Sequence, residues 1–134
     1  MKTFGIGITK EIKFTEEDLN DILCSCFEGG CDYWCCIDNG TPEWDKARDE
    51  LHQNGNELPT FEDVMLHMLM TEKPIRLIDQ EEDVTVYLTM ENFLKGIKMS
   101  IENNFWSGFD TYHVDGLVGD AIIQYAVFGE QVYG

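Results

Sequence analysis

Residues 27–36 read Phe27-Glu28-Gly29-Gly30-Cys31-Asp32-Tyr33-Trp34-Cys35-Cys36, and they mark the place where a helix should end and a candidate site should begin. The apolar residues before them recur at spacings of three and four, which is typical of the buried stripe of a helix. Two glycines then release the backbone, because glycine readily adopts the conformations that end helices. Two large aromatic side chains and three thiols follow. We therefore expect this break to free the rings of Tyr33 and Trp34 from the interior, so that they can meet another molecule.

The chain before this break predicts one strand and a capped helix. Apolar residues alternate with glycines or polar residues over residues 2–14, and this period of two indicates a single long strand that bends at Gly5 and Gly7. Its apolar face consists of Phe4, Ile6, Ile8, Ile12 and Phe14. Thr15 then begins a capping box in which Asp18 replaces the usual glutamate, and the helix should end at Gly29.

The chain after the break predicts further helices and one hairpin. Residues 31–37 predict a short strand or a tight loop, and residues 38–42 predict a turn. The remaining predicted elements are helices over 43–53, 60–70 and 89–101, a hairpin of strands 75–78 and 84–88, a loop over 103–114, a helix over 115–129 and a short tail. The helix over 60–70 is apolar around most of its circumference, so we expect it to be central. This order indicates a single α+β domain over 1–134, with a small antiparallel or mixed sheet packed against about four to five helices.

The composition narrows the possible partners. The formal net charge is −17 at pH 7, because 26 acidic residues face 9 Lys and Arg. Non-specific nucleic-acid binding depends on basic residues that displace counterions from phosphates, so the charge argues against direct binding of DNA or RNA. The acidic surface is either a solvated face or an imitation of nucleic acid that occupies a partner's basic groove. No run of about 18 apolar residues occurs and the first ten residues lack a signal-peptide core, so we expect a cytoplasmic protein without a membrane span.

The cysteines cluster in one short segment. Cys24, Cys26, Cys31, Cys35 and Cys36 are the five cysteines of the chain. Their odd number, without a secretion signal, argues against a disulfide framework. Their spacing does not match the paired C-x2–4-C pattern of zinc sites, so buried apolar thiols are favoured over a metal site. We expect neither a metal nor a cofactor.

No residue pattern points to a catalytic mechanism. Cys31 lies among acidic residues and after a helix C-terminus, where the electrostatic field disfavours a thiolate. Asp110, His113 and Asp115 form an acid–His–acid cluster, but such triples arise easily in an acidic chain. Phosphate-binding glycine loops, HExxH and GxSxG are all missing from the sequence. A non-enzymatic protein is therefore the expectation.

Binding is better supported than catalysis. The backbone at Gly29 and Gly30 and the rings of Tyr33 and Trp34 could line a pocket for a planar base, or the rings could anchor a protein partner. The aromatic residues Trp106 and Tyr112, in the loop before the last helix, could form a second wall. The alternative is that all four rings pack into the core or into a dimer interface.

An anionic ligand would also need positive charge, and few groups can supply it. The candidates are Arg76, Lys95, Lys98 and the helix N-termini near Thr89 and Asp115. The scarcity of these groups argues against such a pocket, unless it is assembled from several subunits.

Three stretches resemble a known set of signatures. They are EGGCDYWC at 28–35, LTMENFLKGI at 88–97 and DAIIQYAVFGEQVYG at 120–134. The chain is thereby similar to a family of small acidic proteins of phages and prophages of Gram-positive, often gut-dwelling, bacteria, with the signatures EGGxxYWC, LTxxx(F/L)LxGI and DxIIQYAxFGExVYG. The matches span most of the chain, and residues 38–59 are where members differ most.

The resemblance implies a phage accessory protein that is expressed inside a bacterial host. Small phage proteins of this kind often block host defence. We therefore expect an anti-defence factor that sequesters a signalling nucleotide. The alternatives are an acidic, nucleic-acid-mimicking inhibitor of a host nuclease or CRISPR-type complex, and a structural or interaction protein of unknown role. The expected partners are a small nucleotide or a host defence protein, with a homo-oligomer as a further possibility.

Overall fold

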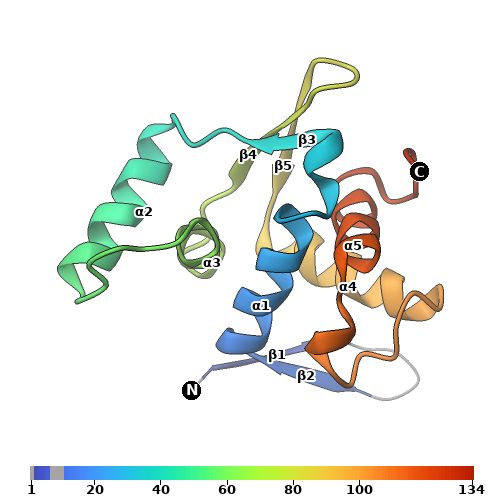
Figure 1. Cartoon of the computed structure of the whole chain (residues 1–134). Coiled ribbons are helices and arrows are strands. Elements are labelled where there is room, and N and C mark those ends of the chain that lie inside the picture. The colour runs from blue at the N-terminus through green and yellow to red at the C-terminus, as the bar shows by residue number, and fades with distance from the viewer. Residues whose placement is uncertain (1, 7–10) are drawn as a thin grey trace.

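The computed structural model describes residues 2–6 and 11–134, which form an α+β fold with five α-helices and two small antiparallel sheets (Figure 1). This confirms the fold class expected from the sequence. The elements in chain order are β1 (Thr3–Ile6), β2 (Ile12–Thr15), α1 (Glu16–Phe27), the 3-10 turn η1 (Cys31–Tyr33), β3 (Cys35–Ile37), α2 (Pro42–Gln53), α3 (Phe61–Met70), β4 (Ile75–Asp79), β5 (Val84–Leu88), α4 (Met90–Glu102), the 3-10 turn η2 (Thr111–His113) and α5 (Gly116–Phe128).

The N-terminal segment is a hairpin and not the single long strand that its alternation predicted. β1 and β2 pair antiparallel, with Phe4 opposite Phe14 and Ile6 opposite Ile12. Alternation along a sequence indicates extended backbone but is unchanged when the chain reverses direction, so it cannot separate one strand from two. The predicted bend residue Gly7 and the apolar Ile8 lie outside the described residues.

The predicted helix starts at Thr15, Thr60, Thr89 and Asp115 are confirmed. Each of these side chains accepts a hydrogen bond from a backbone N–H in the first turn of its helix. The predicted turn over 38–42 extends too far, because Thr41 caps α2 and Pro42 is its first residue. Proline suits this position, where its missing N–H removes no helical hydrogen bond.

The second sheet has the order β3-β4-β5, and its β4–β5 hairpin confirms the predicted one. Of the two possibilities for residues 31–37, the short strand is correct, preceded by one turn of 3-10 helix. Cys36 lies opposite Ile78 in the pairing of β3 with β4. The inward face of the sheet contributes Ile75, Leu77 and Leu88 to the core.

The helices pack in the succession α2, α3, α1, α5 and α4. α3 lies between α2 and α1, as its apolar circumference predicted, and α5 is buried over Val118–Ala126 between α1 and α4 (Figure 1). In the described part of the chain, no helix combines the length and the apolar character that crossing a bilayer requires.

Candidate functional site

The double glycine joins two helices closely and does not open a ligand pocket. Gly29 has φ +80°, a left-handed conformation that ends α1. Gly30 is buried, and a Cβ atom there would lie 2.3 Å from the backbone oxygen of Cys26. A Cβ atom on Gly116, at the start of α5, would lie 2.1 Å from the backbone oxygen of Gly29. Gly30 and Gly116 are therefore glycines because the backbone at the end of α1 leaves no room for their side chains, whereas Gly29 has room and is a glycine because of its left-handed φ.

The expectation that the rings of Tyr33 and Trp34 both leave the interior is wrong for Trp34. Trp34 is 0% exposed, and its ring packs against Phe128 and Tyr133 with centroid separations of 5.2 Å each. Its Nε1–H donates to Oδ1 of Asp120 at 2.7 Å. Consecutive residues at the end of a 3-10 turn point in different directions, so the sequence places only one of the two rings at the surface.

Tyr33 is the ring that reaches the surface, with 53% of the residue exposed. Its hydroxyl donates to Oδ2 of Asp120 at 2.6 Å, so one carboxylate binds both aromatic residues. Burial and this hydrogen bond raise the pKa of Tyr33 to about 12. The exposed ring face is available for contact with another molecule, but the hydroxyl is held by the protein.

The same carboxylate connects to the C-terminal tail through Gln124. The Gln124 side chain donates to Asp120 Oδ1 and to the Tyr133 backbone oxygen at 3.0 Å each, and it accepts from the Val132 and Tyr133 backbone N–H groups at 2.7 and 2.8 Å. Tyr133 in turn donates its hydroxyl to Asp79 of β4 at 2.7 Å. The tail therefore folds back on α5 and the sheet, and it forms no added strand.

This hydrogen-bond network joins the EGGCDYWC and DAIIQYAVFGEQVYG stretches, and its members are Tyr33, Trp34, Asp120, Gln124 and Tyr133. Asp120 is 8% exposed and Gln124 is 0% exposed. In the described part of the chain no Lys, Arg or His forms an ion pair with Asp120. Three donors therefore stabilise its buried charge. Asp120 and Gln124 were missed from the sequence, although two polar residues four apart in an apolar helix are a signal for such a network.

The predicted second wall does not form. Trp106 is 8% exposed, and its Nε1–H donates to Ser100 Oγ at 2.9 Å while its ring lies 6.1 Å from that of Phe14. Tyr112 is 93% exposed. Trp106 is therefore a core residue with a satisfied N–H group, and only Tyr112 of this pair can contact a partner.

Tyr112 borders an acidic cleft of ≈ 740 Å³ between α1 and η2. We use the term acidic cleft for its lining residues, which are Glu17, Asp18, Asp21, Cys24, Ser25, Thr111, Tyr112 and Val114. Three carboxylates and no Lys or Arg line it. A phosphate group would be repelled there, whereas a Lys or Arg side chain would be attracted.

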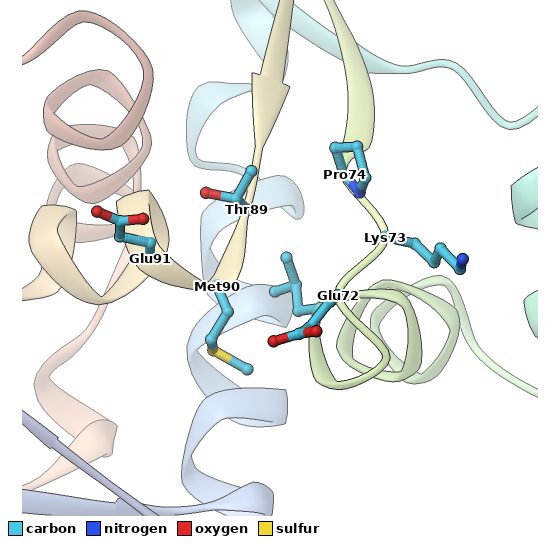
Figure 2. Close-up of a pocket in the computed structure, with 7 residues that line it drawn as sticks. Glu72, Lys73, Pro74, Thr89, Met90 and Glu91 are labelled. Atoms are coloured by element: carbon cyan, nitrogen blue, oxygen red, sulfur yellow. The ribbon is translucent and has the colours of Figure 1, made fainter.

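The predicted anion-binding groups do not converge on one pocket. Figure 2 shows a pocket of ≈ 250 Å³ between the α3–β4 turn and the start of α4, in which Lys73 points away from Thr89 and Glu91. Its lining includes two carboxylates, Glu72 and Glu91, so it does not suit an anion. Lys95 and Lys98 lie on α4 and line none of the cavities described.

Arg76 lines a different cavity, together with Lys73 and the half-exposed ring of Tyr87. The volume of this cavity is ≈ 300 Å³. The Arg76 guanidinium forms an ion pair with Asp38 and donates to Thr85 Oγ at 3.0 Å. A hydrogen bond from the Gly40 N–H, together with Arg76, lowers the pKa of Asp38. Much of the positive charge of Arg76 is therefore already compensated within the chain.

The acid–His–acid cluster consists of helix caps. Asp110 accepts from the Tyr112 N–H at 2.9 Å at the start of η2, and Asp115 accepts from the Val118 N–H at 3.0 Å at the start of α5. Both carboxylates thus satisfy backbone donors that would otherwise lack a partner. Neither is positioned by a bond to His113 among the interactions of the described residues.

Three of the thiols are disfavoured as nucleophiles and as metal ligands, because their pKa values are raised. Cys24 donates to Glu28 Oε2 at 3.0 Å, and this bond, with burial, raises the pKa of Cys24 to about 12. Burial raises the pKa of Cys26, and a hydrogen bond with Cys35 raises that of Cys31. A raised pKa reduces the thiolate fraction that reacts or binds metal. Within residues 2–6 and 11–134, no three His, Cys, Asp or Glu side chains gather as a metal site would require.

The candidate site residues thus separate into two sets. Gly30, Trp34 and Trp106 belong to the packed interior, whereas Gly29 is exposed and Tyr33 and Tyr112 present rings to solvent. Comparisons with protein families, with curated proteins and with solved structures find no match to this chain.

Proposed function

We propose that this chain acts by binding, as an acidic decoy that occupies a basic, nucleic-acid-binding surface of a protein partner. The observation that carries the proposal is the acidic cleft, in which three carboxylates lie beside the almost fully exposed ring of Tyr112. Proteins that bind nucleic acid neutralise phosphates with Lys and Arg. A surface of carboxylates offers the same side chains an alternative set of negative partners.

The neighbourhood of the cleft also offers apolar contacts. Phe109 and Leu117 belong to the same chain segment as Tyr112 and are 75% and 72% exposed. Aromatic side chains are enriched among the residues that supply most of the affinity in protein interfaces, whereas charges set the rate of encounter and the choice of partner. Carboxylates with apolar anchors therefore support a protein partner better than a small anion.

The resemblance to phage and prophage proteins supplies the setting for this proposal. The partner would be a nuclease or CRISPR-type complex of the bacterial host, and the chain would act in the host cytoplasm as an anti-defence factor. Neither the charge nor the cleft distinguishes among such complexes, since their nucleic-acid-binding surfaces are all basic. The alternative is a structural or interaction protein, which would use the same acidic surface to bind a partner without inhibiting a defence complex.

The test is capture of a partner from a lysate of a Gram-positive host. The chain is immobilised beside an unrelated protein of similar acidity, and the proteins that only the chain retains are challenged with salt and with duplex DNA. The proposal predicts that both release the specific partner, because screening weakens charge pairing and DNA competes for the same surface. Retention that neither salt nor DNA affects would contradict it.

Sequestration of a nucleotide is a second candidate, and one cavity favours it. The cavity lined by Lys73, Arg76 and Tyr87 combines a half-exposed aromatic ring with two basic side chains, although Glu43 also lines it and Asp38 pairs with Arg76. A ligand that binds only the folded state raises the melting temperature. A panel of cyclic and ADP-ribose-type nucleotides should therefore stabilise the chain if this candidate is correct, and Lys73→Gln should reduce the shift. A panel without any shift would exclude it for the nucleotides tested.

A further inference from the structure

The outer edge of β5 can be located from the hydrogen bonds of β4. The Asp38 N–H donates to the Arg76 oxygen at 2.9 Å and the Gln80 N–H donates to the Trp34 oxygen at 2.7 Å, so the even-numbered residues of β4 direct their backbone groups toward β3. The odd-numbered residues then bond to β5, where Leu77 lies opposite Val86. It follows that Thr85 and Tyr87 direct their backbone groups away from the sheet.

This edge is accessible in the described part of the chain. β5 is the last strand in the order β3-β4-β5, and Thr85 and Tyr87 are exposed. Val84 is 47% exposed, and the β4–β5 hairpin projects beyond the helices (Figure 1). The Tyr87 oxygen accepts a bond from Asn92 Nδ2 at 2.9 Å, but a carbonyl can accept a second bond.

β5 also lacks the usual protection of an edge strand. Its sequence is VTVYL, which contains no Lys and no Pro, and its register with β4 is continuous from Val84 to Leu88 without a bulge. β-Branched and aromatic residues of this kind favour strand pairing. An exposed edge of such composition is a template for another strand.

We propose that two copies of this chain pair antiparallel through β5, with Val86 of each copy opposite Val86 of the other. In this register Thr85 of one copy lies opposite Tyr87 of the second copy. Both outward-facing residues of each strand then exchange backbone hydrogen bonds, and the two three-stranded sheets become continuous. Val84 lies opposite Leu88 of the second copy, and because Leu88 is already fully buried in its own core, the backbone hydrogen bonds carry the pairing.

Each copy carries a net charge of −17, and the placement of the acidic turns favours the antiparallel orientation of two copies over a parallel one. The turn before β5 carries Glu81, Glu82 and Asp83, and all three are exposed. Antiparallel pairing moves the two acidic turns to opposite ends of the joined sheet, whereas parallel pairing would place them side by side. It also places Asp83 opposite Thr89 of the second copy, the N-cap of α4, where the helix dipole favours negative charge.

The experiment measures mass in solution and compares two substitutions at one position. Sedimentation equilibrium of the chain, from about 10 μM to about 1 mM at moderate salt, should show the mass rise from 15.4 kDa toward that of a dimer. Thr85→Pro removes the outward N–H and should abolish this rise. Both substitutions remove the Thr85 hydroxyl that accepts a hydrogen bond from Arg76, but Thr85→Val keeps the backbone N–H and should still dimerise.

A second measurement does not depend on the folding of Thr85→Pro. Hydrogen exchange of the unaltered chain, measured by NMR at both ends of the concentration range, should show slower exchange of the Thr85 and Tyr87 amides at high concentration. The Val84 and Val86 amides bond within the sheet and should change little by comparison. A chain that is monomeric throughout, or a dimer in which these two outward amides exchange at the same rate, would overturn the proposal.

Discussion

Replacing Asp120 with alanine should destabilise the chain by about 3 kcal/mol, because one buried carboxylate serves three donors. The most costly loss is at Trp34, whose Nε1–H donates to Asp120 at 2.7 Å from a fully buried ring. Without an acceptor this N–H group would contribute an unsatisfied-donor penalty of about 2 kcal/mol. Gln124 keeps a second acceptor at 3.0 Å, so its loss is nearer to about 1 kcal/mol.

The third donor should contribute least. Tyr33 is half exposed, so water can replace Asp120 at its hydroxyl, and Tyr33→Phe should cost less than about 1 kcal/mol. The cost of Asp120→Asn should lie between the costs of Asp120→Ala and Tyr33→Phe, since the asparagine amide keeps one acceptor oxygen but turns its NH2 donor toward another donor. Asp49→Ala, at an exposed site of α2, removes a carboxylate from a helix surface and is the matched control.

Urea unfolding of the four variants, followed by far-UV circular dichroism, gives the free energies of unfolding. The expected order of cost is Asp120→Ala, then Asp120→Asn, then Tyr33→Phe, with Asp49→Ala close to zero. A cost below about 1 kcal/mol for Asp120→Ala would refute the reasoning, because the buried Trp34 N–H would then have another partner. A Tyr33→Phe cost equal to that of Asp120→Ala would also refute it.

Three further predictions follow from pKa shifts and backbone geometry. Folding raises the pKa of Tyr33 from about 10 to about 12. The stability that Tyr33 contributes should therefore be present below pH 10 and lost as the pH rises toward 12. Urea unfolding measured across this pH range should show a smaller loss of stability for Tyr33→Phe than for the unaltered chain. Glu28→Gln should lower the pKa of Cys24 and increase its alkylation by iodoacetamide at pH 8, as read by peptide mass spectrometry; an unchanged rate would show that the hydrogen bond does not control the thiol. Gly30→Ala should destabilise the chain by about 3 kcal/mol or more, because its Cβ atom would clash with the backbone of α1. Gly29→Ala should cost only about 1 kcal/mol, because it places an alanine in a left-handed conformation without a clash. Equal costs for the two variants in urea unfolding would contradict this prediction.

The helix starts and the β4–β5 hairpin could be predicted because their signals are local. Thr15 and Asp18 lie within one turn of helix, and their reciprocal bonds depend on no distant residue. The reversal between β1 and β2 could not be read from alternation, which is the same for one strand and for two. The start of α2 was missed because Thr41 and Pro42 suit both a turn and a helix cap.

The placement of Trp34 could not be predicted because its partner is remote. Asp120 lies 86 residues further along the chain, and without the fold nothing in the sequence indicates that the two side chains meet. The glycine pair was recognised as a break, but its packing against Gly116 depends on tertiary structure. The sequence did not separate the exposed rings of Tyr33 and Tyr112 from the buried rings of Trp34 and Trp106, because each pair lies in a single connecting segment and the partners that bury the tryptophans come from elsewhere in the fold.

The claim that the acidic cleft carries the function is tested most directly by removing the same charge from two places. One variant combines Glu17→Gln with Asp21→Asn in the cleft, and its control combines Asp49→Asn with Glu57→Gln on α2 and the loop after it, away from η2 and α5 (Figure 1). Capture of the specific partner at fixed salt should weaken by about tenfold or more for the cleft variant and change little for the control. Equal weakening by both variants would show that net charge alone drives the binding, and capture unaffected by either would show that the cleft is not the binding surface.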